Sequence, residues 1–375
     1  MRFSMGLAAL VAGKAEAEPL VIHSKSLGAD RKVEVQVPTD YRAGEQYPVL
    51  YVLDGESLFA PAAALARWLE YVTRTPGLIV VGIPNTQRTR DFTTRWTAPG
   101  DAPDSLRWMI PAAGGADAFR GFLTKELIPE IDRRYLTAPF RILAGHSLGG
   151  LFALDTIAKE PSSFASVIAI SPPAAWNNDE VIRGLRSETF AGSAARLFLA
   201  AAGNDPADTL PAFHRLVETL NGVVPAARWR NQILPDEDHG TVAIPALQAG
   251  LQFSFPSWRV PGYLSEGGLV GIREHYSRIS RLYGYRVRVQ ERELSRLAYQ
   301  WLRAKRVDEA VGLFGAISED HPSSANAHDD LGAALAQAGR PSDARREIEK
   351  AVEIAQKAGD ANAEVYRKHL AAIAN

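Results

Sequence analysis

The chain has 375 residues, more than one typical domain needs and enough for a large core. Its 42 Lys and Arg residues nearly balance 43 Asp and Glu residues, so the formal charge of −1 excludes the basic footprint of a nucleic-acid-binding protein. The chain has no cysteine, which excludes thiol catalysis, thiolate metal sites and disulfides.

The N-terminal stretch resembles a short signal peptide at 1–17. Arg2 precedes an apolar run at 3–13, and A-E-A at 15–17 is a small-residue cleavage motif. Lys14 departs from this pattern, so the alternative is an extension without defined structure. We predict a periplasmic or secreted protein, with a cytoplasmic one as the alternative. No other stretch reaches the roughly 18 apolar residues of a membrane span.

Strand-like and helix-like segments alternate over 18–255, which predicts an α/β-hydrolase domain with a mostly parallel sheet and helices on both faces. An opening hairpin is expected from the segments 19–28 and 31–41. Buried strands are expected at 47–55, 77–84, 140–145, 166–172, 195–203 and 227–240. Helices are expected at 61–72, 116–135, 151–160, 210–220 and 242–253. A long loop is expected at 85–114.

The segment "RILAGHSLGG" (141–150) carries a G-x-S-x-G motif centred on Ser147, between a predicted strand and a predicted helix. In such a nucleophile elbow the serine backbone is strained and its hydroxyl stands at the strand's C-terminal edge. The flanking glycines let strand and helix approach closely. The alternative is a glycine-rich turn with an incidental serine. We predict that Ser147 is a nucleophile.

A serine nucleophile needs a base, and His239 is the predicted one. It lies in the loop "DEDHG", between the last predicted strand and the last predicted helix, where it points back towards the elbow. His214, inside an amphipathic helix, is predicted to be a packing residue. His146 is next to the nucleophile, and we expect the two adjacent side chains to diverge.

The acid that orients the base should follow strand 195–203, where the chain reads "NDPADTL". Asp205 is favoured over Asp208 because it lies nearer the strand end, and Glu237 is a third candidate. A Ser-His dyad without an acid is a further alternative. Asp205 could also cap the next helix, with Pro206 in its first turn.

Two backbone N–H groups are predicted to form the oxyanion hole. One belongs to Leu148, the residue after the nucleophile. The other belongs to Glu56, because Gly55 permits a tight turn after strand 47–55 that aims this N–H into the site. The alternative is an ordinary Asp-Gly turn.

Beyond a Pro- and Gly-containing linker at 256–268, the chain reads as helical. We predict a linker and connecting helix over 256–290. One face of this helix is apolar and consists of Ile272, Tyr276, Ile279 and Tyr283. We expect this face to dock on the first domain or on a second subunit. An offset of 34 residues then pairs similar residues, Leu297 with Leu331, Trp301 with Leu335, Ala310 with Ala344, Phe314 with Ile348, and Ile317 with Ala351. This resembles tetratricopeptide repeats, two within 291–375 (291–324 and 325–358) plus a capping helix at 361–373, with an unrelated helical bundle as the alternative.

The segments "YPVLYVLDGES", "NTQRTRDFT", "GHSLGG", "SPPAAW" and "DEDHGT" occur in the order and spacing of a known family. Over 19–255 the chain resembles the putative-esterase family of α/β hydrolases, in the branch of the enterobactin (trilactone siderophore) esterases. The resemblance implies that Ser147 is the nucleophile, His239 the base, and the N–H groups of Glu56 and Leu148 the oxyanion hole.

The resemblance also implies substrate-binding residues. Arg88 and Arg90 look like the family's arginine loop beside the site, and the alternative is a structural pairing with Asp91. Trp176 matches a tryptophan near the pocket wall, and the alternative is core packing. The family often has a second tryptophan where this chain has Ala175.

We therefore expect a serine carboxylic-ester hydrolase that acts through an acyl-enzyme on a small or siderophore-like ester. The alternatives are an acyltransferase that uses the same acyl-enzyme, and a protein-interaction module with an incidental hydrolase domain. We expect no cofactor and, because the eight histidines follow no metal-binding spacing, no metal. The helical repeats are the predicted contact for a protein partner or a homodimer.

Overall fold

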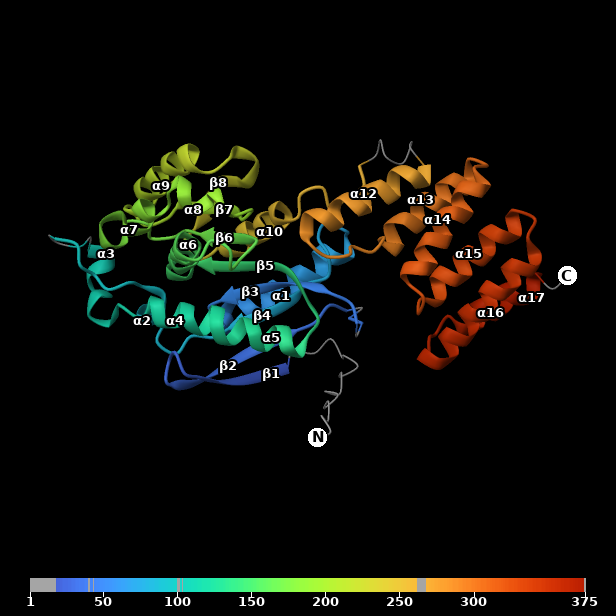
Figure 1. Ribbon diagram of the computed structural model, residues 1–375, viewed down its shortest axis with the longest axis horizontal. Coiled ribbons are helices and arrows are strands. Elements are labelled where there is room, and N and C mark those ends of the chain that lie inside the picture. The colour runs from blue at the N-terminus through green and yellow to red at the C-terminus, as the bar shows by residue number, and fades with distance from the viewer. Residues whose placement is uncertain are drawn as a thin grey trace, which may run out of the picture. The chain divides into compact units, whose positions relative to one another are not determined.

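The computed structural model describes residues 18–39, 41–42, 44–99, 102, 104–261 and 268–373. The predicted signal peptide lies outside these residues. The chain divides into two compact units, Met1–Trp258 and Arg259–Asn375 (Figure 1). The first unit is α/β and the second is helical.

The first unit is built on an eight-stranded sheet in the order β1-β2-β4-β3-β5-β6-β7-β8, as counted over the described residues. The strands are β1 (Glu18–Ser24), β2 (Ala29–Gln36), β3 (Tyr47–Leu53), β4 (Ile79–Ile83), β5 (Thr137–His146), β6 (Ser166–Ile170), β7 (Arg196–Asn204) and β8 (Trp229–Asp238). β1 and β2 form the expected antiparallel hairpin, and β2 also runs antiparallel to β4. The strands from β4 to β8 in this order are parallel, which confirms the predicted fold class.

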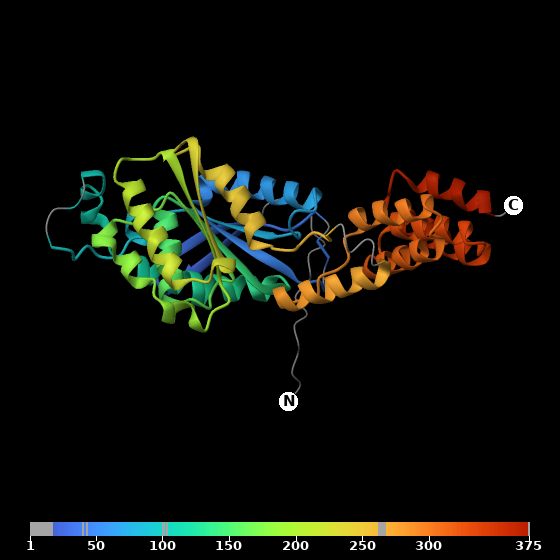
Figure 2. The ribbon, with the colours of Figure 1, turned by 90° about the horizontal axis from the view of Figure 1, so that it is seen from above.

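Helices cover both faces of the sheet because parallel strands need crossover connections. They are α1 (Gly55–Tyr71), α2 (Arg88–Phe92), α3 (Asp104–Arg107), α4 (Ala116–Phe122), α5 (Ile128–Arg134), α6 (Leu148–Lys159), α7 (Trp176–Gly184), α8 (Ser187–Ala191), α9 (Thr209–Val223) and α10 (Ala243–Ser254). The blue α1 and the yellow-orange α10 lie together on one face, and α6 and α9 cover the other (Figure 2).

The central strands read as continuous apolar runs because both of their faces are buried. Every residue of β4 and of β6 is buried, as are six of the seven residues of β3. The carboxyl ends of parallel strands meet at one edge of the sheet, where α/β proteins bind ligands. The loops that follow β3, β5, β7 and β8 therefore converge there.

The expected long loop at 85–114 is not without structure, which corrects the prediction. It contains α2, α3 and a 3₁₀ turn at Ile110–Ala112. These pieces are too short to show an apolar periodicity, so a sequence pattern does not reveal them.

The second unit is helical, and its last five helices contact one another in succession. The helices are α12 (Gly268–Tyr283), α13 (Glu291–Arg303), α14 (Val307–Asp320), α15 (Ala325–Gln337), α16 (Pro341–Ala358) and α17 (Ala363–Ile373). The starts of α13 and α15, and of α14 and α16, are 34 residues apart (325 − 291 and 341 − 307). The predicted apolar face of α12 is buried, and α12 contacts α14 of its own unit. Within the described ranges, no helix is long and apolar enough to cross a membrane.

Candidate active site

Ser147 occupies a strained turn between β5 and α6. Its backbone angles are φ 58° and ψ −122°, a conformation that L-residues rarely adopt. A side chain on Gly145 would place its Cβ 2.2 Å from the Gly149 carbonyl oxygen, so strand and helix approach this closely only because residue 145 is glycine. The turn is held because the Ser147 N–H donates to the Ile170 carbonyl at 2.8 Å. These features are those of a nucleophile elbow.

Three side chains from separate strand ends form a continuous hydrogen-bonded series. The His239 Nδ1 lies 2.6 Å from Asp205 Oδ1, and its Nε2 lies 2.9 Å from Ser147 Oγ. An ionised carboxylate only accepts hydrogen bonds, so Nδ1 carries the proton and Nε2 is left to accept the serine proton. This is the arrangement that nucleophilic catalysis by serine requires.

Asp205 is buried, with none of its side chain exposed, and both of its oxygens are used. Besides the His239 bond, its Oδ2 accepts from the Ser171 hydroxyl at 2.7 Å and from the Ala202 N–H at 2.8 Å. Burial alone would raise the pKa of Asp205, but these hydrogen bonds outweigh it and lower the pKa. The carboxylate is thus held ionised beside the imidazole.

The alternative roles in the acid loop are not seen. The residue before the first turn of α9 is Asp208, not Asp205, and its side chain makes no capping hydrogen bond. Asp205 is therefore not a helix cap, contrary to that interpretation. The carbonyl of Glu237 accepts from the Asn204 amide, and no contact between the Glu237 carboxylate and His239 is recorded in the described part of the chain.

The two predicted oxyanion donors lie at helix N-termini. Leu148 is the first residue of α6 and Glu56 the second of α1, positions whose N–H groups have no partner within their helix. A Cβ on Gly55 would lie 2.6 Å from the Ile83 nitrogen, so only glycine permits this start of α1. The aligned dipoles of both helices favour negative charge there.

The Glu56 side chain is turned to Asn85 in the loop after β4. The Asn85 N–H donates to one carboxylate oxygen at 3.0 Å and the Asn85 side-chain amide donates to the other at 2.8 Å. Partial burial would raise the pKa of Glu56, but the hydrogen bonds from Asn85 lower it below its usual range. Sequence reasoning missed Asn85, because a residue in an irregular loop gives no pattern to detect.

The two predicted substrate-binding arginines are already paired within the protein. Arg88 binds Asp54 through two bonds of 2.6 and 3.0 Å and also donates to the His146 carbonyl at 3.2 Å. Arg90 binds the fully buried Asp91, the structural alternative considered above, and Arg31 binds the same carboxylate at 2.8 Å. The side chains of Arg88 and Arg90 are 36% and 37% exposed. A substrate contact by either arginine stays a prediction.

Trp176 is 1% exposed and packs edge-on against Trp96, with ring centroids 5.2 Å apart. Its indole N–H donates to Thr94 at 3.2 Å. This placement fits core packing, the alternative to the predicted pocket wall. The following residue, Asn177, accepts from the N–H groups of Thr97 and Ala98 at 2.8 Å each.

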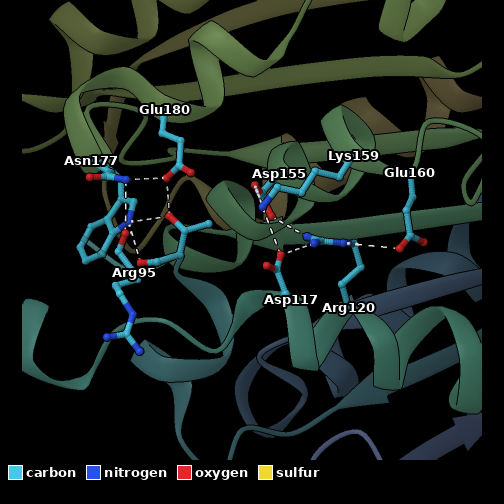
Figure 3. A network of polar contacts seen from close by, with 10 residues as sticks. Arg95, Asp117, Arg120, Asp155, Lys159, Glu160, Asn177 and Glu180 are labelled. Carbon is cyan, nitrogen blue, oxygen red and sulfur yellow. Dashed lines mark hydrogen bonds and ion pairs between the residues drawn. The ribbon is translucent and has the colours of Figure 1, made fainter. Parts of the chain in front are cut away.

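A polar network therefore joins α7 to the loop after α2 (Figure 3). The Asn177 amide also donates to Glu180 at 2.9 Å and to the Arg95 carbonyl at 3.3 Å. Asn177 and the two residues after it have positive φ angles, a costly conformation for residues other than glycine. The network holds this strained turn in place and ties it to the loop after α2.

A second network, also drawn in Figure 3, fixes the helix that follows the nucleophile. The buried Arg120 of α4 binds Asp155 of α6 at 2.6 Å, and Lys159 binds the same carboxylate at 3.0 Å. Removing one member of such a buried pair leaves an uncompensated charge. The network therefore stabilises the packing of α6 on α4.

His214 is exposed on α9, so the prediction that it is a packing residue is wrong. His146 has a contact that the sequence did not predict: its ring lies 4.8 Å from the His239 ring, and its Nε2 lies 2.6 Å from the His239 carbonyl oxygen. Burial, followed by the nearby His239, lowers the pKa of His146 to about 4. The ring is therefore neutral at ordinary pH.

Across the described residues, no group of three or more His, Asp or Glu side chains is arranged to hold a metal ion. The chemistry that the side chains themselves offer is attack by an activated serine next to two helix N-termini. That combination suits acyl transfer from a carbonyl compound.

Comparison with known proteins places the chain in a family. A family model described as "Putative esterase" matches residues 24–233. The ferri-bacillibactin esterase BesA of Bacillus subtilis is 35% identical over 150 residues, which cover 36% of this chain and 51% of the relative. The siderophore enterobactin esterase of Emericella nidulans is 31% identical over 160 residues, with 38% and 52% covered. The chain thus spans about half the length of each relative.

Solved structures share the architecture. An IroE-like serine hydrolase from Shewanella oneidensis has a TM-score of 0.68 at 25% identity and covers 81% of this chain and 99% of its own. An uncharacterised protein from Capnocytophaga ochracea covers 96% of this chain and 99% of its own, with a TM-score of 0.59. At 16% identity this second likeness shows the fold alone.

Proposed function

Because this chain belongs to the Putative esterase family, we propose that it is a serine carboxylic-ester hydrolase that acts through an acyl-enzyme. The observation that carries the proposal is the series Ser147–His239–Asp205 at a positive-φ turn, with bonds of 2.9 and 2.6 Å. A structural role does not explain a serine held in a strained turn with its hydroxyl on an imidazole nitrogen.

The mechanism follows from the proton positions. His239 accepts the Ser147 proton through Nε2 while Oγ attacks the ester carbonyl, and Asp205 stabilises the imidazolium that forms. The N–H groups of Glu56 and Leu148 stabilise the oxyanion. His239 then gives the proton to the leaving alcohol. Water, activated by the same imidazole, hydrolyses the acyl-enzyme and restores Ser147.

We propose a siderophore-like ester as the substrate class. The support is the similarity to esterases whose names state ferri-bacillibactin and enterobactin. No observation favours the acyltransferase or the interaction-module alternative over hydrolysis.

The test is hydrolysis of p-nitrophenyl acetate and of a trilactone siderophore by the wild-type protein and by Ser147→Ala. The variant should keep its fold and lose on the order of 10⁴-fold in kcat, as for a nucleophile that acts as a unit with its base. Products analysed with and without added alcohol separate hydrolysis from acyl transfer. A folded Ser147→Ala protein with wild-type turnover would exclude this function.

We further propose that the helical unit is a pair of tetratricopeptide repeats with α17 as a cap. Helices with equivalent positions start 34 residues apart, and the paired small residues Ala310 and Ala344 are fully buried. Gly332 supports this packing, since a Cβ there would lie 2.4 Å from the Ile348 side chain. On this view the unit contacts a protein partner or a second subunit, which light scattering of the full chain would detect.

The remaining predictions concern boundaries and export. We retain 18–255 as the hydrolase domain, 256–290 as linker and connecting helix, and 291–375 as the repeat domain. Periplasmic or secreted localisation rests on the motif at 15–17. N-terminal sequencing of the protein from fractionated cells would test whether the chain is cleaved after residue 17.

A further inference from the structure

We propose that His146 is a positioning residue for His239, which it holds by a hydrogen bond to the backbone of the base loop, residues 238–241. The inference rests on the proposed function, in which His239 is the general base. His146 is the residue before the nucleophile in the G-x-S-x-G motif. The inference gives this position a role, because its side chain reaches the backbone of the base.

The base loop has little packing to hold it. Asp238, Gly240 and Thr241 are all exposed. The loop is shaped from within, because the Asp238 carboxylate accepts from the N–H groups of Gly240 and Thr241 at 2.8 and 2.9 Å. These bonds set the turn but do not attach it to the elbow. The His239 side chain itself reaches Ser147 and Asp205, so what remains is a contact that fixes the backbone of the loop.

His146 supplies that contact. Its Nε2 lies 2.6 Å from the His239 carbonyl oxygen, across 93 residues of sequence. A carbonyl only accepts, so His146 must carry a proton on Nε2 and donate it into the bond. A carbonyl is also too weak a base to take that proton, so the bond holds the loop without transferring a proton to it. It acts through position alone.

The His239 ring is consequently fixed from two sides. Asp205 holds its Nδ1 at 2.6 Å, and His146 holds its backbone carbonyl. One bond alone would leave the ring free to swing about the Asp205 contact. With both bonds, Nε2 is directed at Ser147 Oγ, the geometry that a general base needs before reaction.

His146 is itself anchored from the opposite side. Arg88 donates to the His146 carbonyl at 3.2 Å and at the same time binds Asp54 through two bonds. A Cβ on Gly149 would lie 3.1 Å from Asp54 Oδ2, so this carboxylate packs against the start of α6. The start of α1, the elbow and the base loop are thereby connected through His146.

The experiment compares three full-length variants in steady-state hydrolysis of p-nitrophenyl acetate, with Ser147→Ala as the inactive reference. His146→Met keeps the side-chain volume and removes the donor, whereas His146→Gln keeps an N–H donor near the position of Nε2. His214→Met is the matched control, because it makes the same change at an exposed histidine. Circular dichroism and thermal melting confirm folding.

We expect His146→Met to lower kcat by roughly 10- to 100-fold, as for a misplacement of a catalytic group by about 1 Å, with little change in KM. His146→Gln should recover most of kcat, and His214→Met should match the wild type. If the Met variant does not fold, His146→Asn takes its place: it is polar but too short to reach the carbonyl, so the same loss of kcat is expected.

Three results would overturn the inference while Ser147→Ala stays inactive. They are an unchanged kcat in His146→Met or in the His146→Asn variant that replaces it, a loss as large in His146→Gln as in His146→Met, and an effect confined to KM, which would place His146 in substrate binding. By contrast, an active Ser147→Ala protein or an inactive wild type would count against the proposed function and not against the positioning role.

Discussion

At the scale of single residues, the site depends on which groups keep their protons. Asp205 accepts three hydrogen bonds in a buried position, so its charge is stabilised without a cationic arginine or lysine. His146 is partly buried, but its partner is a carbonyl, so it stays neutral. The two environments assign opposite tasks to neighbouring groups: one stabilises charge and the other fixes position.

Asp205→Asn should lower kcat far more than Asp208→Asn. The amide cannot accept from the His239 Nδ1–H in the way a carboxylate does, which favours the wrong tautomer, and a loss of up to about 10⁴-fold is expected from comparable triads. Asp208 precedes α9 without capping it, so its replacement should change kcat little. Steady-state kinetics of the two variants measures both values of kcat and shows which aspartate orients His239. Equal effects would mean that the acid is elsewhere or absent.

His146 should also make stability depend on pH. Its pKa is 6.5 in the unfolded chain and about 4 in the fold, so the unfolded state binds the proton first as the pH falls. Stability from this group is complete above pH 6.5 and is lost progressively down to pH 4. Between pH 7 and pH 5 the wild type should lose about 2 kcal/mol more than His146→Gln.

Urea unfolding of the wild type and of His146→Gln at both pH values measures this difference. The groups that face His146 are His239, Asp54 and Arg88, and all are kept in the variant. Parallel pH profiles would show that the imidazole accepts a proton as readily in the fold as in the unfolded chain.

At the scale of elements, the sheet brings the site together. Ser147, Asp205 and His239 each follow the carboxyl end of a different parallel strand, so the sheet itself brings them to one edge. The glycines of the elbow then set how closely β5 and α6 approach. The strain at Ser147 persists because these packed elements determine its backbone.

Gly145→Ala should therefore destabilise the protein and disturb the nucleophile. The added Cβ would lie 2.2 Å from the Gly149 carbonyl oxygen, and backbone atoms cannot give way as a flexible side chain does. The expected loss is about 3 kcal/mol or more, together with a lower kcat. Gly222→Ala is the control, because a Cβ at this position in α9 meets no atom within 4 Å.

The control should gain roughly 0.5 to 1 kcal/mol, as glycine replacement in a helix usually does. Chemical denaturation of both variants gives the two free energies of unfolding. A Gly145→Ala protein as stable and active as the wild type would mean that β5 and α6 do not need this close approach.

Local patterns predict the sheet, the hairpin and the elbow, because apolar runs and G-x-S-x-G report short-range geometry. The same rules led to His239 and Asp205 as loop residues after known strands. The contact of His146 with His239 could not be predicted, since it depends on the turn at Ser147 and on a loop 93 residues away. The helices within 85–114 were missed because each is too short to show an apolar periodicity.

At the scale of the whole molecule, the chain combines an esterase-family unit with a helical unit. Residues 24–233, which the family model matches, include Ser147 and Asp205 but end before His239. The structure nevertheless places His239 in the first unit, at the end of β8. All groups of the proposed mechanism thus belong to one unit, and none of them comes from the helical unit.

The most direct test of the account is covalent labelling of the full chain with a p-nitrophenyl phosphonate, followed by peptide mass spectrometry. The reagent mimics the acyl transfer step and leaves a stable adduct on an activated serine. We expect one adduct per chain, on Ser147, and strongly slowed labelling in His239→Ala. An adduct on another residue, or no adduct in a protein that hydrolyses esters, would contradict the assignment of Ser147 as the nucleophile.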